Sequence, residues 1–529
     1  MAKNSTRGTI AVYPAAGGLE SISIPGMTTA GRVTDGSNFI ININGSKKKH
    51  PGVVRKDDGS QILAPEGYAK ALYDHWRISG NSKVRKTLLV ASGKVWADNG
   101  GNGTFVPVTS PFSIIPYDNV SMTTFFGLLV LCFENNPGGR PLKYDHTTLA
   151  QMASGVPNAK YARTWFNRLW LGGILGAPDR LKASAPDEPE EFGILNGAKE
   201  FNFDQGDHDP IGLTGIMPPL RRVGMAVGKR ESIHKVYPSG NTFATDIVTE
   251  AFGLLSHNSA VAFANDVVFA SDQGVHSLQT TEKFGEVETS YLSAQIQDYY
   301  QENMAFESAE NMRAIYAKEI NSYLLAATTK ASAVNDIVLA YNFLRGEWSK
   351  WEEQVSAFAR WVDPLDNNKS KILVCDDRGR VGILDTTAKG PRVVTWFDER
   401  RTMRFTTGLM YPLGVDKEVT FCLLKCYFKP QTKGSFFTVT CLVDGKIVST
   451  LEVDMSPSDT SVIGTAVIGT DKIQTEGSVK EVARELKGVG SSIELVFSHA
   501  PQSDEEDCEI FGFIVEYEYS GETQIPKQQ

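Results

Sequence analysis

Histidine and cysteine are the side chains most often used for metal binding and proton transfer, and the 529-residue chain has eight histidines and six cysteines. Metal and hydrolytic sites place such residues at fixed spacings. No histidine has a second histidine two or four positions away, and no two cysteines have the C-x-x-C spacing. His208 lies in the acidic stretch 204–209, which lacks the acidic spacing and terminal glutamate of an EF-hand. We interpret that stretch as a polar loop, so the sequence predicts no metal and no other cofactor.

Paired carboxylates are the next candidates, because glycosidases cut sugars with two of them. The turns at 272–274 and 376–379 resemble the Asp-bearing turns of sialidases, but Val275 and Arg380 then break the pattern. Motifs for phosphate-binding loops, serine hydrolases, zinc peptidases and zinc deaminases are absent. We predict no catalytic residues and a protein that is not an enzyme. A glycoside hydrolase is kept as the least favoured hypothesis.

The cysteines are sparse for the length of the chain. Cys422 and Cys426 are an even number of residues apart in an apparent strand and therefore share one face. Buried free thiols are the plain interpretation for all six. The N-terminus lacks the apolar core of a signal peptide, and the longest apolar run, 125–133, is about half of a membrane span. We expect the protein to fold in the cytoplasm, without crossing a membrane.

A basic cluster lies near the N-terminus and consists of Lys47, Lys48 and Lys49, with Arg55 following. The whole chain has a formal charge of −9, which argues against a protein that grips nucleic acid by neutralising it. A solvated basic loop is one interpretation of the cluster. The other is a contact to an acidic partner or to a phosphate backbone, and these four residues are the candidates for it.

The elements that must hold these residues are suggested by an internal repeat. Segment 371–385 reads as a β-hairpin, and degraded copies lie at 266–278 and 87–96. Their turn glycines fall at 93, 274 and 379, so the separations are 181 and 105 residues. These separations correspond to roughly four and two units of about 45–52 residues, the length of a four-stranded propeller blade.

The composition agrees with strands, since 48 glycines and many Asn-Gly and Asp-Gly pairs favour turns over long helices. The predicted fold is all-β: a six- or seven-bladed β-propeller over 61–390, with an extended arm over 1–60. The arm's strand candidate, 38–44, is expected to complete the last blade near 372–385. Only 290–300 is predicted to be helical.

Beyond residue 390 apolar and polar residues alternate, as in strands with one buried face. Segments at 419–428, 436–443, 447–453, 492–497 and 509–519 predict an antiparallel β-sandwich over 391–522. Residues 454–490 are expected to form a long excursion, and 523–529 a flexible tail.

The order of these pieces resembles a family, the tail nozzle or packaged-DNA stabilisation proteins of short-tailed bacteriophages, which carry a β-propeller. The likeness covers about 1–60 and 160–385, and the C-terminal domain has no assignable counterpart. Three places carry it: GGLE (17–20), DGSNFIIN (35–42) and GSKKKHPG (45–52) in the arm; FNRLWLGG (166–173) and PDRLKAS (178–184) with Phe192; and SAVA (259–262) and DVVFAS (266–271) within 256–278.

The resemblance implies a structural protein of the virion tail, assembled in the host cytoplasm. Several copies, expected to be six, would form a ring below the portal and adaptor, near the tail fibres. That ring would retain packaged double-stranded DNA and form the conduit for its ejection, without reading its sequence. The alternative is a glycan-binding tail or surface protein, for which Trp165, Trp170, Trp348, Trp351, Trp361 and Trp396 are candidate stacking platforms, although packing within blades is the preferred interpretation of these six.

Overall fold

A computed structural model describes residues 5–15, 17–21, 31–56, 69–80, 82–98, 103–203, 211–220, 224–278, 291–363, 366, 369–386, 395–431, 434–456, 479–504 and 506–520. Two compact units divide the chain. Unit 1 comprises residues 1–52, 342–351 and 385–529, and unit 2 comprises 53–341 and 352–384. The acidic stretch around His208 lies outside the described residues, as do most of the expected excursion and the tail.

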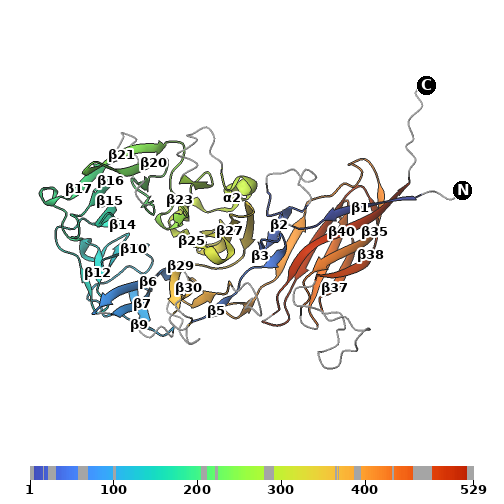
Figure 1. The fold of residues 1–529 in the computed structure, drawn as a ribbon, viewed down its shortest axis with the longest axis horizontal. Coiled ribbons are helices and arrows are strands. Elements are labelled where there is room, and N and C mark those ends of the chain that lie inside the picture. The colour runs from blue at the N-terminus through green and yellow to red at the C-terminus, as the bar shows by residue number, and fades with distance from the viewer. Residues whose placement is uncertain are drawn as a thin grey trace, which may run out of the picture. The chain divides into compact units, whose positions relative to one another are not determined.

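Unit 2 consists of small antiparallel sheets that follow one another along the chain and are arranged in a ring, as in a β-propeller (Figure 1). In the described part of the unit there are seven such sheets. In order they are β6 (Ala69–Ser79), β7 (Ser82–Ala91), β8 (Lys94–Asp98) and β9 (Phe105–Pro107); β10 (Val120–Phe125), β11 (Leu128–Phe133), β12 (Leu142–Tyr144) and β13 (Leu149–Gln151); β14 (Ala159–Trp165), β15 (Arg168–Ile174), β16 (Ala177–Ala183) and β17 (Lys199–Asn202); β18 (Gly215–Ile216), β19 (Met225–Gly228), β20 (Ile233–Ser239) and β21 (Thr242–Thr249); β22 (Val261–Phe263), β23 (Asp266–Ala270) and β24 (Val275–Ser277); β25 (Arg313–Ala317), β26 (Ser322–Thr328) and β27 (Asn335–Asn342); and β29 (Ala357–Asp363), β30 (Lys369–Cys375), β31 (Val381–Leu384) and β5 (Val53–Arg55).

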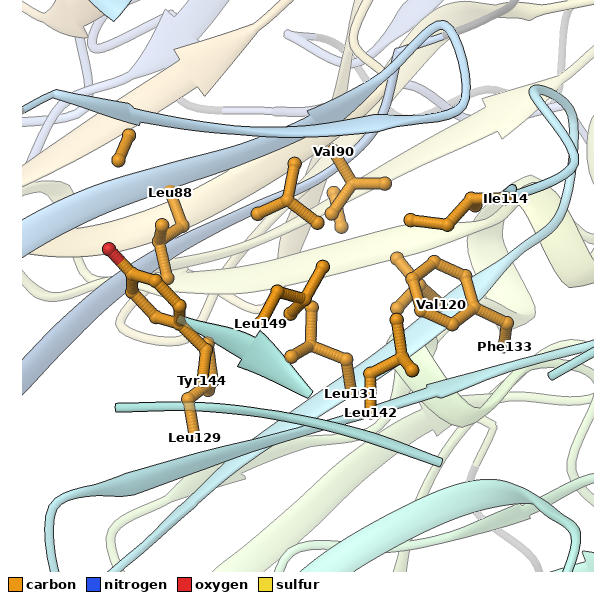
Figure 2. Packing of buried hydrophobic residues seen from close by; sticks show 13 residues of the cluster. Leu88, Val90, Ile114, Val120, Leu129, Leu131, Phe133, Leu142, Tyr144 and Leu149 are labelled. Atoms are coloured by element: carbon orange, nitrogen blue, oxygen red, sulfur yellow. The ribbon is translucent and has the colours of Figure 1, made fainter. Parts of the chain in front are cut away.

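Each of the first four sheets shares one hydrophobic core with the sheet before it and another with the sheet after it, where the sheet before the first is the last one. Strand β11 shows how the sequence produces this arrangement, because five of its six residues are buried. Leu129, Leu131 and Phe133 enter the core shared with the β6–β9 sheet (Figure 2). Val130 and Cys132 point the other way, into the core shared with the β14–β17 sheet. A continuous apolar run therefore indicates a strand covered on both faces.

The ring closes through a core between the first and last sheets. Leu72 and Leu89 of the first sheet pack in one buried cluster with Trp361 and Leu373 of the last. All of these side chains are almost completely excluded from solvent. The first sheet thus has a partner on each side, and no apolar sheet face is left open at the junction.

The three repeated hairpins occupy equivalent places in this order. They are the second and third strands of their sheets: β7–β8 in the first, β23–β24 in the fifth and β30–β31 in the seventh. Spacings of four and two units are therefore confirmed. The β7–β8 turn places Ser92 at φ 51° and Gly93 at φ 69°, the left-handed pair of a tight hairpin turn. A Cβ on Gly93 would lie 2.5 Å from the Ile114 carbonyl oxygen, so the position requires glycine.

The strand that completes the last sheet is not the one expected from the sequence. Strand β5, not segment 38–44, pairs with β31, and Val53 faces Leu384. The arm expected at 1–60 does supply the closing strand, but residues 1–52 belong to unit 1. Strand β3 (Phe39–Ile41) pairs there with β4 (Lys47–Lys49). The short apolar run at 39–41 indicated a strand, but it could not identify the partner of that strand.

Unit 1 contains two antiparallel sheets built from both ends of the chain. Aromatic side chains join them, with ring centroids 5.3 Å apart for Phe428 and Phe437 and 5.5 Å for Phe497 and Phe513. The strands expected beyond residue 391 are present, joined by strands from the N-terminal arm. One sheet has the order β3, β4, β40 (Glu509–Ser520), β35 (Val419–Phe428), β38 (Lys480–Gly490), with β1 (Ser5–Val12) also on β40; the other has β2 (Val33–Ser37), β34 (Met403–Thr407), β39 (Ile493–His499), β36 (Phe436–Val443), β37 (Lys446–Asp454); the remaining strands of the unit are β28 (Glu347–Trp351), β32 (Thr395–Trp396) and β33 (Glu399–Arg400).

Helices are short throughout the described residues. The α-helix expected over 290–300 begins later, as α2 (Gln297–Asn303), directly after one 3₁₀ turn. The 3₁₀ segments are η1 (Pro137–Gly139), η2 (Ile194–Asn196), η3 (His257–Ser259), η4 (Ala294–Ile296), η5 (Phe306–Asn311) and η6 (Lys318–Ile320).

We predict that ring closure depends on Val53, which is fully buried, and not on Val54, which is 41 % exposed. Val53→Ala should lower the free energy of unfolding by about 2 kcal/mol, because it removes buried methyl groups and leaves a cavity. Val54→Ala, the matched control one residue away, should change it by less than about 0.5 kcal/mol. Urea denaturation followed by tryptophan fluorescence checks both, and equal effects would contradict the closing role of β5.

Candidate functional site

The first strand of each sheet in unit 2 faces the middle of the ring, where a cavity of about 270 Å³ lies. Every one of the seven sheets, or a loop next to it, contributes to the wall. Its apolar side chains are small or medium in size, as at Ala71, Val120, Ala262 and Ile315. A ring of short inner strands therefore leaves a central space that is lined mainly by residues with apolar side chains.

Two arginines interrupt this apolar wall, Arg163 on β14 and Arg313 on β25. The Arg313 guanidinium is held by main-chain oxygens: Nη1 donates to Glu310 O at 2.7 Å and to Met312 O at 2.9 Å. Its Nη2 donates to Asn119 Oδ1 at 2.6 Å. Arg313 thus links β25 to the segment before it and to the edge of the second sheet, which is a structural role.

Arg163 is held differently. Its Nε donates to Ile216 O at 3.0 Å, which links the third and fourth sheets. Burial lowers the Arg163 pKa to about 10, against a weak opposing effect of the Tyr73 phenol. Burial also lowers the pKa of Arg313 to about 10. The pKa of Lys70, which is close to Arg313, falls to about 8, first through burial and then through that guanidinium. The middle of an acidic chain is therefore positively charged.

A second cavity of about 160 Å³ adjoins the first and contains a serine–histidine pair, Ser121 and His257. Ser121 Oγ lies 2.9 Å from His257 Nε2, a distance found in nucleophilic dyads. The opposite ring nitrogen, Nδ1, accepts a hydrogen bond from Ile216 N at 3.1 Å. Because Nδ1 is an acceptor, the neutral ring carries its proton on Nε2 and donates it to Ser121.

This tautomer is the opposite of the one a nucleophile needs. A general base must accept the serine proton, and here the histidine already donates one. The Ser121 hydroxyl is further engaged by the next sheet, since its Oγ accepts from Ala162 N at 3.1 Å and donates to Ala162 O at 3.3 Å. Burial, followed by the charges of Arg163 and Arg313, holds the His257 pKa well below its usual value. The pair stabilises the contact between neighbouring sheets.

The sequence predicted neither this pair nor the two arginines as site residues. One signal was available, because Arg163 lies within β14 next to the buried Ala162, and Arg313 begins β25 directly after the buried Met312. A charge in a buried strand is rarely tolerated without a specific interaction. The sequence did not show where these two arginines lie in the ring of sheets. Only the sheet order shows that both lie on innermost strands.

The predicted basic cluster lies in a different environment from the one expected. Lys47, Lys48 and Lys49 form strand β4 and are only 1 %, 9 % and 0 % exposed. The expectation of a solvated loop is therefore wrong, and in this conformation their ammonium groups face the interior of unit 1. Lys47 Nζ donates to Ala15 O and Gly31 O, the latter at 2.9 Å.

Lys48 has a charged partner, Asp507, at 3.3 Å. Arg55, the fourth candidate, lies on β5 and belongs to unit 2. The four residues therefore do not form one basic surface patch within either unit. The lysine run appears as a loop in sequence because a strand of three buried lysines is rare.

The carboxylates weighed for catalysis hold turns or lie apart. Asp376 is 1 % exposed and accepts from the backbone N–H groups of Arg378 and Arg380 at 3.1 and 2.7 Å. Its other oxygen accepts from Arg380 Nε at 2.5 Å. Asp272 follows β23, in a different sheet from Asp376. In the part of the chain that the structure describes, no three His, Cys, Asp or Glu side chains are grouped to hold a metal.

The cysteines and tryptophans fit their plainer interpretations. All six cysteines are free, five are buried, and burial raises the pKa of the Cys132 and Cys426 thiols. The six tryptophans weighed as sugar platforms are at most 7 % exposed, so they pack inside the protein. Among the described helices, none is long and apolar enough to cross a membrane.

Comparison with known proteins assigns no family to the chain. No protein-family model matches the sequence, and no curated protein matches it. Among solved structures, the chain is similar to the BBS1N chain of a complex with ARL6DN, at 12 % identity and a TM-score of 0.39, over 64 % of this chain and 99 % of that one. The Pan2 WD40 domain of Neurospora crassa gives 9 % identity and a TM-score of 0.36, over 68 % and 98 %. An exo-beta-1,3-galactanase from Phanerochaete chrysosporium gives 8 % identity and 0.23, over 88 % and 100 %.

We predict that Ser121 does not react with a fluorophosphonate. Its hydroxyl donates to a carbonyl, and His257 Nε2 is already protonated, so no group removes the serine proton. Intact-mass spectrometry after incubation should show unmodified protein, with trypsin modified in parallel as the positive control. An adduct mapped to Ser121 would contradict the assigned tautomer.

We also predict a pH-dependent contribution of Lys47 to stability. Burial lowers its pKa to about 7, so between pH 7 and the ordinary lysine value the unfolded chain binds one more proton than the folded chain. Stability should therefore rise with pH across that window, by about 1 kcal/mol per pH unit at most.

The Lys47→Met variant removes this titration. Denaturation curves from pH 6 to 10 should show wild type gaining stability relative to Lys47→Met as the pH rises. Lys446→Met, at an exposed position of the same unit, should run parallel to wild type. Parallel curves for Lys47→Met as well would contradict the assigned burial of the ammonium group.

Proposed function

We propose that unit 2 is a seven-bladed β-propeller and that unit 1 is a β-sandwich completed by the N-terminal arm. The seven sheets in sequence order, the core between the first and last of them, and the closing strand β5 support the blade count. Two facing antiparallel sheets joined by Phe428–Phe437 and Phe497–Phe513 contacts support the sandwich. This arrangement provides rigid surfaces with no assembled catalytic group among the described residues.

We propose further that the protein is a structural component of a short-tailed bacteriophage tail. Several copies form a ring around the tail axis, below the portal and adaptor, and the ring retains packaged DNA and gives it a path out. The resemblance in the arm and in segments 166–184 and 256–278 supports the family. The net charge of −9 supports a conduit over a DNA-gripping protein, because a negative surface adheres weakly to sliding phosphates.

The observation that carries self-assembly is an exposed apolar edge of unit 1. Strands β37 and β38 lie at the ends of their sheets. Three large apolar side chains on them face solvent in the single chain: Ile447 is 68 % exposed, Val448 37 % and Val489 63 %. Val489 also lines a groove of about 540 Å³ over β35, β38 and β40. Unpaired edges that carry apolar side chains associate with other chains unless they are covered.

The same edge fits the geometry of a ring. Identical copies joined by a head-to-tail contact form a closed ring when the rotation closes. The β37 part of the edge, Ile447 and Val448, does not line the groove, so these two side chains and the groove are different patches, as such a contact requires. The groove has charged walls, with Arg7 paired to Glu518 at 2.7 Å and Lys425 paired to Glu516 at 2.6 Å. These charges at the rim of the groove favour one orientation of a second copy.

Mass photometry of the full chain, alone and with the portal–adaptor complex of the same genome, tests the assembly. The chain has a mass of 57.9 kDa, and a closed ring of six copies has a mass of about 350 kDa. The double variant Ile447→Asp/Val489→Asp should remain a monomer under both conditions. Leu195→Asp, a control at a fully exposed apolar position in unit 2, should assemble as wild type does.

Electron microscopy of the assembly with the portal–adaptor complex tests the position. Density that encircles the tail axis supports the conduit. Projections at the periphery, together with glycan-array binding, would favour the glycan-binding alternative instead. A chain that stays monomeric with the portal–adaptor complex and binds no glycan would contradict both the conduit and the glycan-binding alternative.

A further inference from the structure

Arg163 carries a positive charge in the middle of unit 2 without a described anionic partner. Among the described residues only Ile216 O accepts a hydrogen bond from it, through Nε. The terminal nitrogens Nη1 and Nη2 have no such partner. No described carboxylate is close enough to raise its pKa. Arg313, on another part of the wall, has its terminal nitrogens bonded to four oxygens.

An uncompensated buried charge is costly, because the group has left water without gaining an opposite charge. Proteins usually place a carboxylate beside a buried guanidinium. Here the described side chains that line the cavity include two arginines and no aspartate or glutamate. Arg163 keeps an intermediate exposure, and the cavity is the space that it lines.

The rest of the wall indicates what kind of anion fits. Most of the lining residues carry apolar side chains, including Leu72, Met122, Ile315 and Phe358, while polar atoms also face the space. Asn258 adds an amide, which donates and accepts hydrogen bonds. A volume of about 270 Å³ is slightly below the usual range for ligand pockets, so the occupant is small. A strongly hydrated phosphate dianion would lose much of its hydration against such a wall, whereas an apolar group bearing one carboxylate would not.

We propose that the central cavity of unit 2 binds a small organic carboxylate, whose oxygens accept two hydrogen bonds from the Nη1 and Nη2 groups of Arg163 while its apolar body contacts the inner strands. The planar guanidinium fork matches a carboxylate with two parallel hydrogen bonds. The Nε contact to Ile216 O fixes the orientation of the fork. This site lies entirely within unit 2 and is independent of the assembly proposed above.

Benzoate is a suitable probe because it combines one carboxylate with a compact apolar ring. Benzyl alcohol is the neutral partner of similar size. Calorimetric titration of the full chain with benzoate should give saturable binding, and benzoate should raise the melting temperature in a concentration-dependent way. Benzyl alcohol should do neither. Equal effects of the two compounds would overturn the proposal, because the charge would then play no part.

Variants of Arg163 test whether its side chain binds the carboxylate. Arg163→Met keeps the length and apolar character of the stem and should weaken benzoate binding about tenfold or more, since charge-assisted hydrogen bonds are lost. Arg163→Lys keeps the charge without the fork and should retain part of the binding. Arg180→Met, at an exposed position of β16 and paired to Glu200 at 2.8 Å, is the control and should bind benzoate as wild type does. Unchanged affinity in Arg163→Met would overturn the proposal.

Two further outcomes are decisive. If Arg163→Met does not fold, the ratio of benzoate affinities between wild type and Arg163→Lys decides, and a ratio of one overturns the proposal. Inorganic phosphate is titrated in parallel, and binding of phosphate without benzoate would also overturn it by replacing the ligand class. None of these titrations depends on the assembly of several copies into a ring. A failure to bind benzoate is therefore distinguishable from a failure of the chain to assemble.

Discussion

Shared apolar cores between successive sheets are the constraint on which unit 2 depends. Each sheet is too small to bury a strand such as β11 by itself, and both faces of that strand are apolar. A sheet of this kind needs a neighbour on each side, and a linear series always leaves two faces uncovered. Packing the last sheet against the first removes both uncovered faces at once. Ring closure therefore follows from the buried faces of the strands.

Polar groups then stabilise the junctions that the apolar cores create. Arg163, His257 and Ser121 all connect one sheet, or the loop beside it, to a neighbouring sheet, through Ile216 or Ala162. Each uses a main-chain oxygen or nitrogen as its partner. Such contacts do not depend on the identity of the partner side chain, so they tolerate sequence variation there. Buried polar groups without hydrogen-bond partners would destabilise the ring of sheets. Both ring nitrogens of His257 have such a partner.

The sequence predicted local structure well and long-range pairing poorly. Hairpins at 87–96, 266–278 and 371–385 were recognisable because glycine turns between apolar runs are local signals. The partner of strand 39–41 was not recognisable, because an apolar run shows that a strand is buried but not what covers it. The lysines of β4 were misread for the same reason, since their burial is imposed by β40, more than 450 residues later. Only the sheet order shows that Arg163 and Arg313 line the same cavity.

Strand β40 has a consequence for the order of events during synthesis. It pairs with β1 and β4 near the start of the chain and with β35 near the end. A nascent chain therefore emerges from the ribosome with its first segment unpaired, and that segment must stay unpaired while about 450 further residues are made. Contacts so distant in sequence form slowly, because much chain entropy is lost in closing the loop. The N-terminal strands consequently remain without their β40 partner until residues 509–520 have been made.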